Sequence, residues 1–130
     1  TSGFCDILHE GHITILSDAA SFSDVLIFGG KADSSVKKLK GQIRPINNEH
    51  SRAIIMASLI MVDAVVIFDE ETPLELIKII KPDVLIKGGD YTEETIIGAR
   101  EVLEGGGRIE IIPILEGFST TGIIKKISLE

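Results

Sequence analysis

Cysteine is almost absent from this chain, and its scarcity limits what the protein can be. Of the 130 residues only Cys5 is a cysteine, which excludes a disulfide bond within the chain. Nothing in the sequence resembles an export signal. Together these two features predict a reducing, cytoplasmic setting.

Long apolar runs, internal repeats and low-complexity segments are also missing. Hydrophobic residues make up 44% of the chain, but they fall into short runs that could not span a bilayer. A chain of 130 residues is long enough to bury a core without disulfide or metal support. We therefore predict one globular domain over residues 1–130, with no membrane segment.

Basic charge is in short supply as well, with 13 Lys and Arg against 20 Asp and Glu and a formal net charge of −7. A nucleic-acid-binding protein normally presents a broad basic face, so we predict no nucleic-acid partner. The cations nevertheless gather between residues 31 and 44, where the single acid is Asp33. They are Lys31, Lys37, Lys38, Lys40 and Arg44. A small phosphorylated ligand would account for this patch, and a solvated lysine-rich loop would account for it equally well.

Apolar runs without alternation indicate strands that are buried on both faces, as in a parallel sheet. Such runs cover residues 25–28, 64–68 and 84–86, and we expect a further strand over residues 109–114. Thr1-Ser2-Gly3 is typical of the end of a further strand whose apolar part is missing, and we expect upstream residues or an upstream domain to precede it. We therefore predict about five strands, the first of them truncated.

Segments with helical spacing of apolar residues separate these strands. The expected helices cover residues 11–20, 48–62, 73–80 and 93–103, and a last helix carries Ile123 to Ile127. Asn47 or Asn48 can cap the second helix, and Thr72 before Pro73 caps the third. Gly105 to Gly107 can supply a left-handed end to the fourth. Because parallel neighbours need helical crossovers, the alternation predicts an α/β, doubly wound parallel sheet of Rossmann-like type.

Ligands of such sheets bind beyond the carboxyl ends of the strands, and four chemically unusual segments fall there. They are residues 3–12, Gly29-Gly30-Lys31, Lys87-Gly88-Gly89-Asp90 and Ser119-Thr120-Thr121. Each segment alone is weak evidence, since Gly-Gly-Asp is often only a turn. Their convergence on one rim predicts a binding site there.

Two histidines mark the start of the first predicted helix. His9 and His12 stand where free backbone N–H groups and the helix dipole attract an anion, and Gly11 between them lets a nucleotide approach the backbone. A capped helix start or part of a metal site are the alternatives. A zinc site would need more ligands than His50 and Cys5 could add. We therefore predict phosphate contact and no metal held by the protein alone.

These residues resemble a known family. His9-Glu10-Gly11-His12 matches the HxGH signature of the cytidylyltransferase-like nucleotidyltransferases, and Ser119-Thr120-Thr121 matches their carboxyl-terminal S-T-T motif. Within that family, the chain is most similar to the adenylyltransferase domain of the ADP-heptose synthases. The segments that carry this likeness are Asp6 to His9, Ser35 to Gly41, Arg44 to Asn47, Thr72 to Leu74 and, above all, Pro82 to Tyr91.

The resemblance implies a reaction and a set of site residues. ATP would react with D-glycero-β-D-manno-heptose 1-phosphate, with Mg²⁺, to give pyrophosphate and ADP-heptose, a precursor of the lipopolysaccharide core. It implies a homodimer and assigns His9, His12 and Lys37 to catalysis and Arg52 to the substrate phosphate. The nucleotide would contact Gly3, Phe4, Asp6, Gly11, Lys87, Gly88, Asp90, Ser119, Thr120 and Thr121. Asp6 would orient its loop or help to hold Mg²⁺. The alternatives are a cytidylyltransferase acting on a polyol or alcohol phosphate, and a nucleotide-binding module without turnover.

Overall fold

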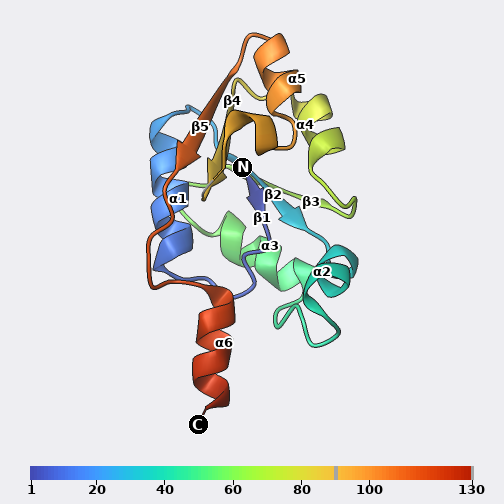
Figure 1. Ribbon diagram of the computed structural model, residues 1–130, viewed down its shortest axis with the longest axis vertical. Coiled ribbons are helices and arrows are strands. Elements are labelled where there is room, and N and C mark those ends of the chain that lie inside the picture. The colour runs from blue at the N-terminus through green and yellow to red at the C-terminus, as the bar shows by residue number, and fades with distance from the viewer. Residues whose placement is uncertain (90, 130) are drawn as a thin grey trace.

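The computed structural model describes residues 1–89 and 91–129, which form an α/β fold (Figure 1). Strands and helices alternate along nearly the whole of this part of the chain. The elements are β1 (Ser2–Gly3), α1 (Glu10–Ser21), β2 (Ile27–Lys31), α2 (Asp33–Lys40), α3 (Glu49–Ala57), β3 (Ala64–Phe68), α4 (Leu74–Ile80), β4 (Val84–Gly88), the 3-10 turn η1 (Glu93–Thr95), α5 (Ala99–Glu104), β5 (Arg108–Ile112) and α6 (Thr120–Ser128).

All strand pairs of the described residues are parallel, as the sequence predicts. Hydrogen bonding divides the strands into a sheet with the order β1-β2-β3 and a second sheet of β4 and β5. Gly29 is paired with Ser2 on one side and with Val66 on the other, so β2 is the central strand of the first sheet. The predicted count of about five strands is confirmed, but in the described part of the chain no ladder joins the two sheets.

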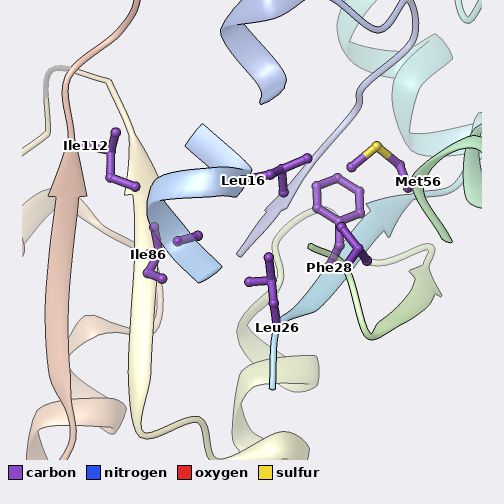
Figure 2. Close-up of a cluster of buried hydrophobic side chains, with 8 residues drawn as sticks. Leu16, Leu26, Phe28, Met56, Ile86 and Ile112 are labelled. Atoms are coloured by element: carbon purple, nitrogen blue, oxygen red, sulfur yellow. The ribbon is translucent and has the colours of Figure 1, made fainter. Parts of the chain in front are cut away.

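A shared hydrophobic core holds the two sheets together. Leu16 and Ala19 of α1 pack in one cluster with Phe28 of β2 and with Ile86 and Ile112 of the second sheet (Figure 2). Each of these five side chains is at most 4% exposed. Helix α1 therefore bridges the two sheets through side-chain packing, where backbone hydrogen bonds do not.

Helices cover both faces of the fold, which is the doubly wound arrangement. Successive side chains of a strand point to opposite faces, and the neighbours Leu85 and Ile86 of β4 accordingly belong to different clusters. Ile86 packs with Leu16 of α1, whereas Leu85 packs with Ile77 of α4 and Val102 of α5. One buried strand thus serves two cores.

The local structure differs from the sequence-based expectations at several places. The basic segment is not a lysine-rich loop but contains α2, whose last turn carries Lys37, Lys38 and Lys40, where cations are favoured by the helix dipole. The expected helix over residues 93–103 is broken into η1 and α5. Gly98 stands at the break with φ +87°, and a Cβ there would lie 2.5 Å from Cδ1 of Ile77. Finally, Gly29, Gly30 and Lys31 lie within β2 and not in a loop at its end. Lys87 and Gly88, predicted in the loop after a strand over residues 84–86, likewise lie within β4.

Other predicted boundaries are close to those observed. Asn48 caps α3, where its side chain accepts a hydrogen bond from the Ser51 N–H over 2.8 Å. Helix α3 ends at Ala57, five residues before the predicted end. Pro73, and not Thr72, is the residue that precedes α4. Gly106 has the left-handed conformation expected after α5, with φ +86°. No helix in the described ranges is both long and apolar enough to cross a membrane.

Candidate active site

A cavity of about 350 Å³ lies at the carboxyl ends of the strands, where the sequence places the ligand. Most of the predicted site residues line it. They are Gly3, Phe4, Asp6, His9, Gly11, His12, Lys87, Gly88, Ser119, Thr120 and Thr121. Segments more than 100 residues apart are thus brought together, and Thr120 Oγ1 donates a hydrogen bond to the Ile7 carbonyl over 3.2 Å. Asp90 lies outside the described residues.

A larger cavity, of about 490 Å³, lies at the amino-terminal ends of β2 and β4. Apolar side chains such as Leu26, Leu76 and Ile80 line much of it, and neither histidine of the HxGH motif nor any hydroxyl of the S-T-T motif does. Parallel α/β sheets bind ligands at the opposite ends of their strands. We therefore place the candidate site in the smaller cavity.

The two histidines form a stacked pair at the start of α1. His9 is the N-cap residue, and the ring centroids of His9 and His12 lie 3.8 Å apart with 25° between the planes. The His9 backbone N–H donates to Nδ1 of His12 over 3.2 Å. Because Nδ1 of His12 accepts this hydrogen bond, the neutral ring carries its proton on Nε2. His12 can therefore donate one hydrogen bond, from Nε2, to a ligand.

Both histidines are held in the neutral form. Burial, assisted by the neighbouring His9, lowers the pKa of His12 to about 4. Burial also lowers the pKa of His9 below its usual value. Nδ1 of His9 is buried and has no hydrogen-bond partner among the described residues. Such an unsatisfied atom costs free energy unless a ligand or a water completes it.

Gly11 gives the His9 ring its room. A Cβ at Gly11 would lie 2.8 Å from Cε1 and 2.9 Å from Nδ1 of His9, and 3.3 Å from Cβ of Phe118. Any side chain at this position would push the imidazole out of its place. Gly88 has a comparable role, because a Cβ there would collide with Cδ1 of Ile15 on α1. Gly88 therefore allows the end of β4 to approach α1 closely, whereas Gly11 leaves space for the His9 ring and Phe118.

The start of α6 supplies a second anion-binding feature. Ser119 is the N-cap residue, and its hydroxyl accepts a hydrogen bond from the Gly122 N–H over 2.9 Å. The N–H groups of Thr120 and Thr121 belong to the first helical turn, which has no carbonyl partners within the helix. Together with the helix dipole they favour a bound phosphate. The predicted capping role and the predicted phosphate-binding role of Ser119 are compatible.

Lysines approach the cavity from two sides. Lys87, at the end of β4, has its Nζ 5.2 Å from the centroid of the Tyr91 ring. Burial, together with the nearby Lys31, lowers its pKa. Nζ of Lys40, which also lines the cavity, lies 5.5 Å from the centroid of Phe4. Nζ of Lys31 lies 5.3 Å from the same centroid and donates to the Glu71 carbonyl, but Lys31 is absent from the cavity lining. The Phe4 ring thus orients cations at the edge of the site.

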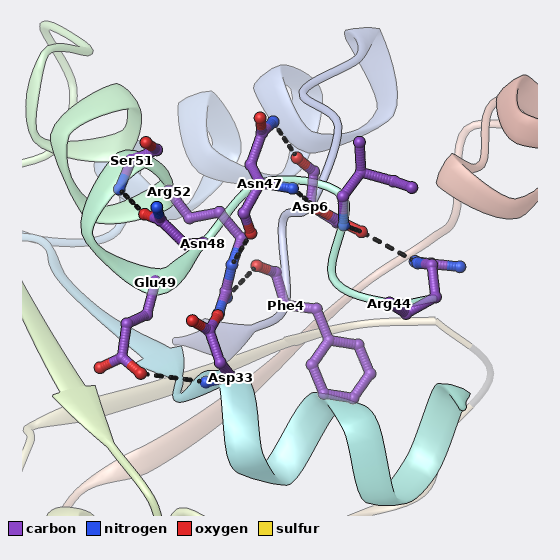
Figure 3. A network of polar contacts seen from close by, with 10 residues as sticks. Phe4, Asp6, Asp33, Arg44, Asn47, Asn48, Glu49, Ser51 and Arg52 are labelled. Atoms are coloured by element: carbon purple, nitrogen blue, oxygen red, sulfur yellow. Dashed lines mark hydrogen bonds and ion pairs between the residues drawn. The ribbon is translucent and has the colours of Figure 1, made fainter. Parts of the chain in front are cut away.

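Asp6 organises the loop that follows α2. Its carboxylate accepts hydrogen bonds from Nε of Arg44 at 2.9 Å and from the N–H groups of Ile46 and Asn47 at 2.8 Å each (Figure 3). Burial opposes ionisation, but the two N–H groups and the guanidinium outweigh it and hold the pKa of Asp6 below its usual value. Asp6 is 1% exposed and its oxygens are occupied, so it fits the predicted orienting role and not that of a Mg²⁺ ligand.

Arg52 and Lys37 are not brought into the cavity. Arg52 is 2% exposed, and its guanidinium donates to the carbonyls of Phe4 and Asn47 and to the carboxylate of Asp33 (Figure 3). Lys37 lies on the exposed side of α2 and is absent from the cavity lining. Lys40 and Arg44 line the cavity instead. The sequence indicated only that Lys40 and Arg44 belong to a basic segment. The structure is needed to show that these two cations line the cavity, unlike the other cations of the segment.

This fold and this arrangement of HxGH and S-T-T residues define a nucleotidyltransferase. A family model described as cytidylyltransferase-like matches residues 1–126, and the chain belongs to that family. Its curated relatives include the bifunctional protein HldE of Koribacter versatilis, 53% identical over 126 residues. The HldE protein of Aliarcobacter butzleri is 54% identical over 127 residues. These alignments cover 97% and 98% of this chain but only 26% of each relative.

A solved structure supports the same assignment of fold. The crystal structure of the lipopolysaccharide core biosynthesis protein from Thermoplasma volcanium matches with a TM-score of 0.69 and 28% sequence identity. The match covers 88% of this chain and 92% of that one. The chain spans about a quarter of the length of the curated relatives that it matches.

Proposed function

We propose that this chain transfers the adenylyl group of ATP to D-glycero-β-D-manno-heptose 1-phosphate, giving ADP-heptose for the lipopolysaccharide core and pyrophosphate. The proposal rests on one observation: the residues of both motifs, His9, His12 and Ser119 to Thr121, line the same cavity. The relatives named HldE, at about half identity over nearly the whole chain, support the choice of substrates. Consumption of ATP is consistent with a cytoplasmic reaction.

The proposed chemistry needs little proton transfer. A non-bridging oxygen of the sugar phosphate attacks the α-phosphorus of ATP and forms a new P–O bond. The bond from that phosphorus to the oxygen bridging to the β-phosphate breaks, and its electron pair leaves with pyrophosphate. Because the second pKa of a phosphate monoester is about 6, the attacking group is already charged at neutral pH. The protein therefore acts by aligning two anions and stabilising charge.

Each motif then has a defined task. Nε2–H of the neutral His12 donates to an oxygen of the α-phosphate, where charge changes during transfer. The first turn of α6, at Thr120 and Thr121, holds the β- and γ-phosphates. Gly3 and Gly88 allow the nucleotide to approach the backbone, with Lys87 beside it. Lys37 and Arg52 remain proposed phosphate contacts, and both would require side-chain movement from the positions described above.

We propose that Mg²⁺ enters with ATP and is held mainly by its phosphates and by water. The described residues contain no group of three His, Cys, Asp or Glu side chains placed to bind a metal ion. The carboxylate of Asp6 is committed to Arg44, Ile46 and Asn47. Mg²⁺ commonly keeps several waters and binds through substrate phosphates, which agrees with such a site.

We also propose a homodimer formed through α3. Ile54 and Ile55 on this helix are 53% and 38% exposed, and Ile60 beyond its end is 98% exposed. Met56 on the same helix is 1% exposed and belongs to the core. The exposed isoleucines therefore exceed what the core of one chain uses, and a second copy could cover them.

The test is a substrate matrix with pyrophosphate release as the readout. ATP and CTP are each combined with heptose 1-phosphate and with glycerol 3-phosphate, and we expect turnover with ATP and heptose 1-phosphate. Release only with CTP and glycerol 3-phosphate would support a cytidylyltransferase instead. Nucleotide binding without release in any combination, unchanged in His12→Ala, would indicate a binding module without turnover.

A further inference from the structure

Arg44 is a buried cation whose guanidinium is only partly used by the protein. The residue is 8% exposed, and it lies in the connection between α2 and α3. Its Nε donates to Asp6 at 2.9 Å, whereas no hydrogen bond from either terminal nitrogen to another described residue is present. Arg44 is also one of the residues that line the 350 Å³ cavity. Two guanidinium nitrogens are therefore available at the wall of the active site.

The position of this guanidinium is fixed from behind. Asp6 accepts from Arg44 and from two consecutive backbone N–H groups just beyond it, and Nδ2 of Asn47 donates to the Asp6 carbonyl over 2.8 Å (Figure 3). The loop and the arginine are thus tied to the residue three positions before His9. A guanidinium held through Nε keeps its remaining N–H groups in a fixed plane, the geometry that binds two oxygens of a phosphate at once.

We propose that Arg44 binds the phosphate group of the sugar phosphate substrate and positions it for attack, an inference that rests on the proposed function. The phosphates of ATP already have donors in His12 and the first turn of α6. The second anion needs a cation of its own within the same cavity. Lys87 lies near the end of β4 with its Nζ over the Tyr91 ring, whereas Arg44 reaches the cavity from the separate α2–α3 connection.

Lys40, the last residue of α2, differs from Arg44 in rigidity. Lys40 also lines the cavity, but it is exposed and makes only a distant contact with the Phe4 ring, at 5.5 Å. A solvated lysine can attract an anion without fixing its orientation. Alignment of the attacking oxygen with the α-phosphorus requires a fixed donor. Arg44 meets that requirement and Lys40 does not.

The test compares Arg44→Lys with the unmodified chain in steady-state kinetics. Lysine keeps the positive charge beside Asp6 but cannot bind two phosphate oxygens in a plane. We expect KM for heptose 1-phosphate to rise about tenfold or more, with KM for ATP changed less than about twofold. Lys38→Gln, which removes an exposed cation from α2, is the matched control and should change neither constant. An unchanged KM for the sugar phosphate, or a rise confined to ATP, would overturn the proposal.

A binding measurement separates this inference from the proposed function. Calorimetry with D-mannose 1-phosphate, in the presence of a non-hydrolysable ATP analogue, reports occupancy of the acceptor site without turnover. Suppose that the unmodified chain binds D-mannose 1-phosphate but releases no pyrophosphate, and that Arg44→Lys loses this binding. That result would retain the Arg44 site and reject the proposed reaction. Pyrophosphate release by the unmodified chain, with equal binding of D-mannose 1-phosphate to it and to Arg44→Lys, would retain the proposed reaction and reject the Arg44 site. Arg44→Gln, checked for folding by circular dichroism, should weaken binding at least as much as Arg44→Lys.

Discussion

The backbone N–H of His9 donates to Nδ1 of His12 over 3.2 Å, and this single hydrogen bond determines which nitrogen of His12 faces a ligand. The cap residue of α1 thereby sets the tautomer of the residue one turn later. The free Nε2–H becomes a neutral donor, and the helix start and the candidate catalytic group are parts of one local structure.

Replacement of His12 should show whether its role depends on the Nε2–H donor or on the imidazole ring itself. Glutamine can place an amide N–H near the position of Nε2, whereas alanine cannot. We expect His12→Ala to lower kcat by about 10²- to 10³-fold, the usual cost of a lost transition-state donor, and His12→Gln to retain part of the activity. Pyrophosphate release measures both. Equal kcat for His12→Ala and the unmodified chain would remove His12 from the mechanism.

The low pKa of His12 should appear in the pH dependence of stability. Its pKa is about 4 in the folded chain and 6.5 in the unfolded one, so the unfolded state binds more protons between these values. The free energy of unfolding should therefore rise as the pH increases from 4 to 6.5 and level off above that. Urea unfolding across this range, with His12→Gln as the comparison, checks the slope. NMR titration of the His12 ring should show its midpoint near the lower value, and a midpoint above 6.5 would contradict the neutral form.

Gly11→Ala should damage the site without damaging the fold. Alanine in the first turn of α1 stabilises a helix by about 0.5–1 kcal/mol relative to glycine, but its Cβ would meet the His9 ring at 2.8 Å. We expect kcat/KM for ATP to fall at least tenfold while the melting temperature stays unchanged or rises. Ser17→Ala, an exposed substitution on the same helix, is the control and should leave kcat/KM unchanged. A large loss of stability in Gly11→Ala would contradict this separation.

Asp6→Asn should destabilise the chain strongly. Asparagine has the shape of aspartate but no charge, so the buried Arg44 would lose its ionic partner and one N–H donor would face an amide N–H. Breaking a buried pair in this way costs about 3–5 kcal/mol in the free energy of unfolding. Chemical denaturation measures the loss, and Asp18→Asn on the exposed side of α1 should change stability by less than about 0.5 kcal/mol. Similar values for the two variants would mean that Asp6 does not anchor the loop.

The proposed dimer makes a prediction about mass. Light scattering should give twice the mass of one chain, and Ile54→Glu combined with Ile60→Glu should reduce it to one chain because charged side chains would replace the exposed isoleucines. The fold should survive, since both positions lie outside the core. A single-chain mass for the unmodified protein at all concentrations would reject the dimer.

The features that the sequence predicted well are those encoded locally. The strands at residues 64–68 and 84–86 are continuous apolar runs, although Ala64 and Ile67 of β3 are exposed, and the HxGH and S-T-T motifs are short patterns tied to helix starts. Helix α2 was missed because its polar, lysine-rich sequence has little apolar periodicity, although tertiary contacts such as the Asp33 N–H to Glu49 bond hold it. The break at Gly98 depends on the side chain of Ile77, which no local pattern reveals.

The site was predicted in its outline and missed in its details for the same reason. Which end of the sheet binds the ligand follows from strand polarity, and the motif residues follow from their spacing. The choice among five cations between residues 31 and 44 does not, because it depends on which side of α2 meets Phe4 and on the hydrogen bonds of Asp6. Arg44 and Arg52 are similar in sequence context, yet one lines the cavity and the other is enclosed by carbonyl groups and Asp33.

Because the strands form two separate sheets, ligands bound in the cavity contact both halves of the fold. Asp6 and Arg44 belong to the half built on β1 to β3. Lys87 lies in β4 and Ser119 to Thr121 follow β5 in the other half, and in the described residues no ladder crosses between the two halves. A nucleotide and a sugar phosphate bound together would connect the two halves and stabilise the junction between the two sheets. We expect saturation of the protein with both ligands to make the junction more rigid. Amide exchange along β4 should then be slower than with either ligand alone.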